Sequence, residues 1–348
     1  MKYSFLGKSG LQVSEICFGV MTFTSKKGWT HLGNQEQKDA NRLTSIAIEN
    51  GINFFDTADV YSLGISEIML GKALGSKRKN VVIATKGEGK MWDGPNGEGH
   101  SRQHLIRACD ESLKRLKTDY IDLYQVHSFD FMTPLEETMS VLDTLVKSGK
   151  VRYIGISNFF AWQIMKLQAI AEKNNWERIT SLQAYYSLVG RDLEYEQIPP
   201  CIDQGIGIIV WSPLHGGILS GKYRKGKKWP KGTRLVKPGH HLPYNVNRGE
   251  EILTVMEKIS KERKVSMSQV ALNYTLRKPG ITSVIIGARN EKQLLDNIAV
   301  SDWELNEEEI KQLDEVSSPA RIYPYWYFDI FKKEKMENYF RNLYKKGN

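Results

Sequence analysis

Short apolar runs alternate with amphipathic, helix-like segments along most of this chain, and this alternation limits the folds that it can adopt. The pattern indicates an α/β protein with a parallel sheet, because two parallel strands need a crossover connection that a helix usually supplies. Eight runs are strand-like, and eight strands can close into a barrel. We predict strands near Ile16–Gly19, Asn53–Ala58, Val81–Lys86, Ile121–His127, Val151–Ser157, Ser181–Ser187, Gly207–Ser212 and Ser283–Gly287.

The segments between these runs have helical periodicity. In the best-defined one, apolar residues recur at Ile252, Val255, Met256 and Ile259, which gives one stripe that faces the core. We predict helices over Lys38–Asn50, Arg102–Leu116, Pro134–Ser148, Ala161–Asn174 and Glu250–Glu262.

The two ends of the chain lie outside this repeat. Residues 2–15 have the pattern of a hairpin with a glycine-bearing turn, which could close the floor of a barrel. We find no long Pro/Gly/Ser linker, so we expect one domain, with a hairpin at 1–15, a barrel at 16–316 and a C-terminal loop and helix at 317–348. We expect that last helix to dock on the barrel, with a membrane-surface helix or a subunit contact as the alternatives.

Composition and charge limit the classes of molecule that this protein could bind. The formal charge of +9 could attract nucleic acid or a phosphorylated small molecule, but much of the excess lies in Lys225–Lys237 and Lys332–Lys346 and indicates solvated surface. We find no nucleic-acid-binding motif and predict no such partner. No window approaches the ~20 apolar residues of a membrane span, and no signal peptide is apparent at the N-terminus.

Cysteine and histidine spacing gives no sign of a metal site. Cys17, Cys109 and Cys201 are widely separated and indicate reduced thiols in a cytoplasmic protein. His100 and His104 are four residues apart, but no carboxylate completes a zinc set with them. We therefore predict no metal and expect both histidines to be exposed.

Four ionisable residues follow successive strand-like runs. Asp56, Lys86 and His127 each come directly after an apolar run, and Tyr61 lies in the loop five residues past Asp56. A parallel barrel brings the carboxyl ends of its strands to one mouth, where barrel enzymes carry out their chemistry. We therefore expect a phenol, an ammonium, a carboxylate and an imidazole to meet there.

These groups suit the reduction of a carbonyl, in which the oxygen gains negative charge and must be protonated. A free tyrosine titrates near ~10, and a neighbouring ammonium such as Lys86 favours the phenolate and lowers that pKa. Asp56 could supply the counter-charge that a buried lysine needs, and His127 could hold the substrate oxygen as a donor. Taken singly, each residue has a structural explanation: Asp56 as a cap, Lys86 as a surface charge and His127 as a core histidine. Together at successive strand ends they are hard to explain by packing.

Eight segments carry a family pattern: L-G-K-S-G-L-Q-V-S at 6–14, F-D-T-A-D-V-Y at 55–61, A-T-K at 84–86, Q-V-H at 125–127, G-I-S-N-F at 155–159, W-S-P-L at 211–214, L-S-G-K-Y at 219–223 and G-A-R-N-E-K-Q-L-L-D-N at 287–297. In this order they resemble the aldo-keto reductase superfamily, especially its bacterial branch and the related potassium-channel β subunits. The resemblance implies a (β/α)8 TIM barrel that binds a nicotinamide dinucleotide across its mouth without a Rossmann domain. It also implies a catalytic tetrad of Asp56, Tyr61, Lys86 and His127, with Tyr61 as the general acid.

The resemblance also implies cofactor contacts. Ser157 and Asn158, helped by Gln183, would bind the nicotinamide carboxamide, and Trp211 would stack on the ring. The remaining contacts would be made along the pyrophosphate and the adenosine by Ser212, Pro213, Leu214, Lys222, Arg234, Gly287, Arg289, Gln293, Asp296 and Asn297. Arg289 stands beside a helix start, where a guanidinium favours the 2′-phosphate of NADPH over NADH. Asp296 is shorter than the glutamate that the family often has there.

We therefore expect a cytoplasmic NADPH-dependent carbonyl reductase, with an NADPH-binding redox sensor or regulatory scaffold as the alternative. Relatives occur as monomers and as larger rings, so a homo-oligomer is compatible with the sequence. The substrate rim predicted for this chain is rich in aromatics and suits an apolar carbonyl compound or a sugar. It comprises Val20, Met21, Phe23, Trp92, Ser128–Met132 and Tyr323–Phe328.

Overall fold

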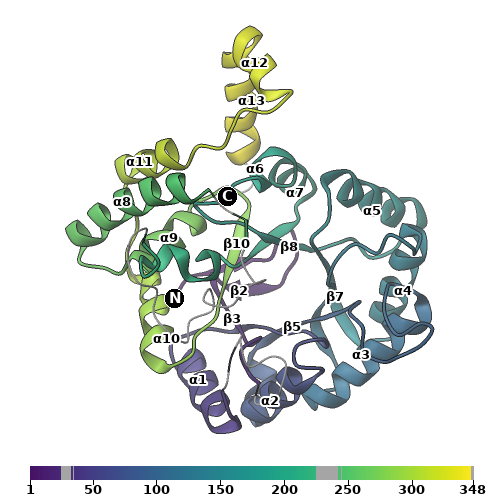
Figure 1. Cartoon of the computed structure of the whole chain (residues 1–348). Helices are drawn as coiled ribbons and strands as arrows, with labels where there is room; N and C mark the ends of the chain where they lie inside the picture. Colours follow the sequence, from purple (N-terminus) through teal and green to yellow (C-terminus); the bar gives the residue numbers. More distant parts are fainter. Residues whose placement is uncertain (25–32, 34, 225–241, 244, 346–348) are drawn as a thin grey trace.

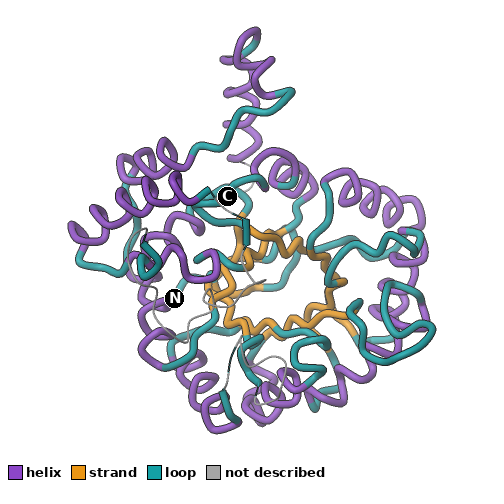
Figure 2. Tube along the Cα trace, viewed as in Figure 1, coloured by secondary structure: helices purple, strands orange, loops and turns teal. Residues whose placement is uncertain are grey.

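A closed barrel of eight parallel strands forms the centre of the protein, as the computed structural model shows (Figures 1 and 2). The structure describes residues 1–24, 33, 35–224, 242–243 and 245–345. The barrel strands follow one another in chain order, and the last pairs with the first. They are β3 (Ile16–Gly19), β4 (Phe54–Asp56), β5 (Val82–Gly87), β6 (Ile121–Val126), β7 (Val151–Ser157), β8 (Ser181–Tyr185), β9 (Gly207–Trp211) and β10 (Ile281–Ile286). The predicted (β/α)8 TIM barrel is confirmed.

The strands read as apolar runs because they are covered on both faces. Every residue of β5 and of β6 is buried, so side chains on one face fill the barrel and those on the other pack under helices. Lys86 and Gln125 are polar residues of these two strands, and both side chains are fully buried. They must be held by partners in that interior.

Helices surround the strands, as the purple ring outside the orange barrel shows in Figure 2. Side-chain caps fix where several of them begin: Ser101 accepts a hydrogen bond from the backbone N–H of His104, and Asn290 accepts one from Gln293. The helices are α1 (Gln37–Glu49), α2 (Ile65–Leu74), α3 (Arg102–Leu116), α4 (Leu135–Lys147), α5 (Ala161–Asn174), α6 (Leu193–Glu196), α7 (Ile198–Gln204), α8 (Val246–Arg263), α9 (Met267–Leu276), α10 (Glu291–Ile298), α11 (Glu307–Ser317), α12 (Tyr325–Phe331) and α13 (Lys333–Lys345).

The N-terminal hairpin closes one end of the barrel. Strands β1 (Tyr3–Phe5) and β2 (Gln12–Ser14) pair antiparallel, and Leu6 and Val13 are fully buried in one apolar cluster with barrel residues such as Phe54. Gly7, at a φ of 59°, lies so close to the chain before β9 that a Cβ there would stand 2.3 Å from the Gly205 carbonyl oxygen. This contact leaves the opposite end of the strands as the open mouth.

The C-terminal segment was predicted to dock its helix on the barrel and to add aromatic residues to the substrate rim, and only the first prediction holds. The end of α13 does dock on the barrel, where Leu343 is buried and the helix contacts α7. Residues Tyr323–Phe328, however, lie outside the ring of helices and form no wall of the mouth (Figure 1). No helix within the described ranges is both long enough and apolar enough to cross a membrane.

Candidate active site

The four predicted site residues lie together at the mouth. Asp56 ends β4, Lys86 is next to last in β5, His127 follows β6, and Tyr61 lies in the loop after β4. The Lys86 ammonium stands 5.1 Å from the centre of the Tyr61 ring, and the Tyr61 and His127 rings meet edge to face at 5.6 Å. The phenol is thus placed between a cation and an imidazole.

A buried ion pair supports this group from below. The Lys86 ammonium donates to Asp56 Oδ1 at 2.7 Å and to the Thr57 carbonyl oxygen at 2.7 Å. Burial disfavours the charged lysine, but the charges of Asp56 and Tyr61 and their hydrogen bonds outweigh it, so the pKa of Lys86 is raised. Lys86 therefore remains a cation beside the phenol at neutral pH.

Two glutamines complete the surroundings of Asp56. The side-chain amide of Gln183 donates to Asp56 Oδ2 at 2.7 Å, and that of Gln125 lies 3.5 Å from the same oxygen. Asp56 is only 3% exposed, and each of its carboxylate oxygens has a donor, as a buried carboxylate needs. Gln183 was predicted to help bind the nicotinamide, and Gln125 was not predicted as a site residue. The signal for Gln125 was a polar residue inside an apolar strand, two residues before His127.

His127 is held as a neutral imidazole. Burial, followed by the positive charge of Lys86, lowers the pKa of His127 to about 3. Its backbone is fixed on both sides, since its N–H donates to the Gly87 carbonyl and its carbonyl accepts from the Asn158 amide, each at 3.0 Å. A neutral imidazole has one N–H to donate, which suits a group that holds a carbonyl oxygen without competing for its proton.

A row of polar and aromatic side chains continues from His127 along the mouth. The Asn158 amide also donates to Ser157 Oγ at 3.0 Å, and its carbonyl oxygen accepts from the Trp211 indole N–H at 3.1 Å. The Trp211 ring lies 5.1 Å from that of Tyr185. A hydroxyl, an amide and a flat indole from the ends of β7 and β9 are therefore joined in one hydrogen-bonded row beside the tetrad.

Known proteins with similar sequences show which family this chain belongs to. The model of the aldo/keto reductase family matches residues 15–318. This chain belongs to that family. An uncharacterised oxidoreductase, YrpG, of Bacillus subtilis is 38% identical over 330 residues, which cover 91% of this chain and 96% of the relative. Versiconal hemiacetal acetate reductase of Aspergillus parasiticus is 35% identical over 352 residues, covering 93% and 99%. A probable voltage-gated potassium channel subunit beta of Arabidopsis thaliana is 34% identical over 312 residues, covering 87% and 92%.

Membership makes this protein an oxidoreductase of a family that reduces carbonyls with nicotinamide cofactors. In this aldo/keto reductase the W-S-P-L segment begins at Trp211, the last residue of β9. Ser212, at a φ of 55°, turns the chain back so that its hydroxyl accepts from the Gly216 N–H at 3.2 Å. Pro213 is buried, Leu214 is half-buried and Lys222 is exposed. Arg234, predicted to line the pyrophosphate, lies outside the described residues.

The predicted adenosine contacts surround the start of α10. Gly287 and Arg289 are exposed in the turn after β10, and the Arg289 N–H donates to the Gln293 side chain at 2.9 Å. Asn297 is buried on the inner face of α10. The Asp296 carboxylate accepts from Ser266 Oγ at 2.8 Å and from the Gln269 amide at 2.9 Å. Asp296, predicted as a cofactor contact, is therefore hydrogen-bonded to the N-terminal part of α9.

The predicted exposure of His100 and His104 in this reductase is wrong, because both side chains are fully buried. The His104 Nδ1–H donates to the Asn96 carbonyl oxygen at 3.1 Å, and the ring packs 4.8 Å from that of Trp92. The His100 ring stacks on Phe159 at 6.3 Å. The two histidines thus hold the β5–α3 loop against α3 and the neighbouring loops, and Trp92 faces α3.

Burial makes His100 a source of acid sensitivity. Burial lowers the pKa of His100 to about 4, whereas an unfolded histidine titrates near ~6.5. Between these values the unfolded chain binds more protons than the native protein, so the free energy of unfolding falls as the pH drops. We expect a loss of about 2 kcal/mol at pH 5 from this residue. Urea unfolding at pH 7.5 and pH 5 should show His100→Gln reducing the difference, and Gln103→Ala leaving it unchanged.

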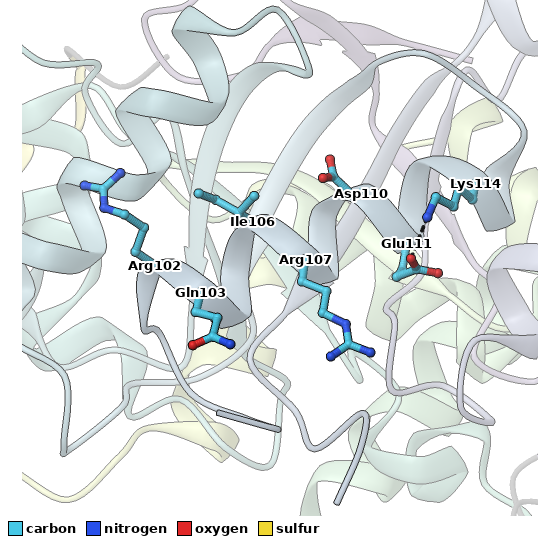
Figure 3. Close-up of a pocket in the computed structure, with 7 residues that line it drawn as sticks. All are labelled: Arg102, Gln103, Ile106, Arg107, Asp110, Glu111 and Lys114. Carbon is cyan, nitrogen blue, oxygen red and sulfur yellow. Dashed lines mark hydrogen bonds and ion pairs between the residues drawn. The ribbon is translucent and has the colours of Figure 1, made fainter. Parts of the chain in front are cut away.

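A hollow on the side of the reductase is unrelated to this site. It measures about 630 Å³ and lies on the outward face of α3, as Figure 3 shows. It holds none of the tetrad, and its charged side chains largely pair with each other or with neighbours, as Glu111 does with Lys114. The residues that line it are Arg102, Gln103, Ile106, Arg107, Asp110, Glu111 and Lys114.

Proposed function

We propose that this protein is an NADPH-dependent reductase of aldehydes or ketones in which Tyr61 is the general acid. The observation that carries the proposal is the position of the Tyr61 ring, 5.1 Å from the Lys86 ammonium and 5.6 Å from the His127 ring. Each part has a task. Tyr61 donates its hydroxyl proton to the carbonyl oxygen, and the Lys86 cation stabilises the phenolate that remains. His127 holds the same oxygen with its N–H.

Asp56 acts through Lys86. Its carboxylate balances the ammonium in an interior that would otherwise favour neutral lysine, and the amides of Gln183 and Gln125 keep that carboxylate in place. Asp56 is therefore a positioning residue, whereas Tyr61 and His127 touch the substrate. This division of roles predicts that changes at Asp56 alter both stability and rate.

The residues beside the tetrad fit a nicotinamide. Its carboxamide needs a donor and an acceptor, which Ser157 and Asn158 offer at the end of β7, and its flat ring needs a flat neighbour such as Trp211. When bound, the reduced nicotinamide supplies the hydride that the carbonyl carbon receives. Ser212, Pro213, Leu214 and Lys222 continue the same edge and would hold the pyrophosphate.

Arg289 supports the choice of NADPH. It is exposed next to Asn290, which caps α10, so a guanidinium and a helix N-terminus occur together at a place suited to the 2′-phosphate. We expect Arg289→Gln to weaken NADPH binding by about 10- to 100-fold, because a charge-assisted contact is lost. NADH binding should change little. Fluorescence titration with both cofactors measures this, with Lys292→Gln on the same helix as the control. Equal losses for both cofactors would contradict the assignment.

The direct test is NADPH oxidation, followed by absorbance, over a panel of apolar aldehydes, ketones and sugars. Turnover supports the reductase and ranks its substrates. Tight NADPH binding without turnover on the whole panel would instead support a sensor or scaffold. The three cysteines are free and buried, which supports a cytoplasmic location as part of the proposal.

A further inference from the structure

The last two helices form an arm that leaves the body of the protein. Residues after α11 lead outward, α12 stands clear of the ring of helices, and α13 returns toward α7 (Figure 1). We call residues 323–345 the arm. The arm lies on the side of the barrel that also carries α11 and α6 (Figure 1).

The inner side of the arm is firmly attached. The Tyr325 hydroxyl donates to the Tyr195 carbonyl oxygen, and the two rings lie 5.4 Å apart. Tyr325 also stacks on Phe340 at 6.2 Å, and Leu343 is only 6% exposed. These contacts on α6 and α7 fix the position of the arm, so the residues on its outer side have a defined arrangement.

The outer side of the arm exposes an aromatic patch. Neighbouring rings touch one another, as Tyr327 does with Phe331 at 4.8 Å and Trp326 with Tyr323 at 5.9 Å. No residue of α12 is buried. The patch consists of Tyr323 (70% exposed), Trp326 (45%), Tyr327 (41%), Ile330 (67%) and Phe331 (63%).

This patch has the size at which an exposed apolar surface is often functional. With about 200 Å² for each aromatic side chain, the exposed fractions amount to roughly 500 Å² of apolar surface. Monomers rarely expose a contiguous apolar patch above a few hundred Å², and one partner of a standard protein interface buries about 800 Å². The patch with a polar rim would therefore supply most of one side of a stable dimer. Tyr, Trp and Phe are also the residues enriched at such interfaces.

Charge indicates which partner fits. The arm includes five basic and three acidic residues, whereas Glu307–Ser317 of α11 includes five acidic residues and one lysine, and three of those acidic residues are exposed: Glu307, Glu308 and Glu315. An anionic membrane would attract the arm but repel the acidic helix beside it. A second copy of this chain carries both charges, so each basic arm can face the acidic helix of the other copy.

We propose that the arm is a dimerisation element. Its aromatic patch packs against the arm side of a second copy, and the contact is isologous, so both copies use the same surface. The basic residues that follow the patch, Lys332 and Lys333, face the exposed Glu307 and Glu308 of the other copy. Such a contact is self-complementary, because the arm and α11 are used by both copies at once. It also removes the patch from water in a closed dimer.

The first test is the mass in solution. Sedimentation velocity of the full chain at micromolar concentration should give twice the 39.8 kDa of one chain. The variant Trp326→Ser/Ile330→Ser/Phe331→Ser should sediment as a monomer, with a dimer dissociation constant raised at least about 100-fold. A control with Leu63→Ser/Trp162→Ser, at residues 64% and 61% exposed elsewhere, should remain dimeric. Circular dichroism and melting temperature check that all three proteins are folded.

The second test separates the charged contact from the apolar one. Lys332→Glu/Lys333→Glu should weaken the dimer about tenfold at low salt, as should Glu307→Lys/Glu308→Lys, and the four changes together should restore it. The proposal is overturned if the wild-type chain is a monomer at tens of micromolar, or if the triple Ser variant keeps the wild-type mass. A monomer that floats with phosphatidylserine vesicles through the same three residues would overturn it in favour of a membrane.

Discussion

Replacing Tyr61 by phenylalanine should lower kcat by about 10³-fold while leaving the affinity for NADPH within about twofold of wild type. The hydroxyl is the only part removed, so the ring keeps its edge-to-face contact with His127 and its place over Lys86. The carbonyl oxygen then lacks a proton donor when it becomes negative. Stopped-flow measurement of NADPH oxidation, together with fluorescence titration of the cofactor, separates the chemical step from binding.

Tyr124→Phe is the matched control, because it also removes only a tyrosine hydroxyl. Tyr124 is fully buried on β6, and its hydroxyl has no hydrogen-bond partner among the described residues. Tyr124→Phe should therefore keep kcat within about twofold of wild type. The role of Tyr61 would be contradicted if Tyr61→Phe turned over at the wild-type rate, or if it failed to bind NADPH.

The barrel and the meeting of the tetrad were predictable because both depend on chain order. Strands covered on both faces read as apolar runs, and a charged residue directly after such a run must lie at the mouth of a parallel barrel. Asp56, Lys86 and His127 all have this position. The bounds of α3 and α5 were predictable because both helices begin and end where their periodicity does, whereas α8 begins at Val246 and not at Glu250 as predicted.

Other features depend on contacts between distant segments, which periodicity does not encode. Nothing local indicates that the Gln183 amide would reach Asp56, 127 positions away. His100 and His104 were predicted to be exposed, but both are buried, and the His104 ring contacts Asn96 and Trp92 of the loop before α3. The aromatics at 323–328 resemble a substrate rim, but Tyr325 packs on Tyr195 of α6, and Tyr323, Trp326 and Tyr327 are exposed. In each case the sequence shows the side chain but not the distant residue that it contacts.

Replacing Asp56 by alanine should destabilise the protein by about 3–5 kcal/mol, because it leaves the Lys86 cation buried without its counter-charge. Lys86 is 0% exposed and its ammonium stands 2.7 Å from Asp56. The exposed pair of Arg42 and Glu291 is the control, since Glu291→Ala should cost less than about 1 kcal/mol in the same urea titration. An Asp56→Ala cost as small as that of the surface pair would contradict the buried-charge argument.

The double variant Asp56→Ala/Lys86→Met separates stability from catalysis. Removing both charges leaves no unpaired ion, so most of the stability lost in Asp56→Ala should return, while turnover should stay at least about 100-fold below wild type because the cation beside Tyr61 is gone. Urea titration and NADPH oxidation on the two variants and the wild type measure both quantities. If the double variant recovered activity with stability, Lys86 would serve only to pack the barrel, and the phenol of Tyr61 would need another source of positive charge.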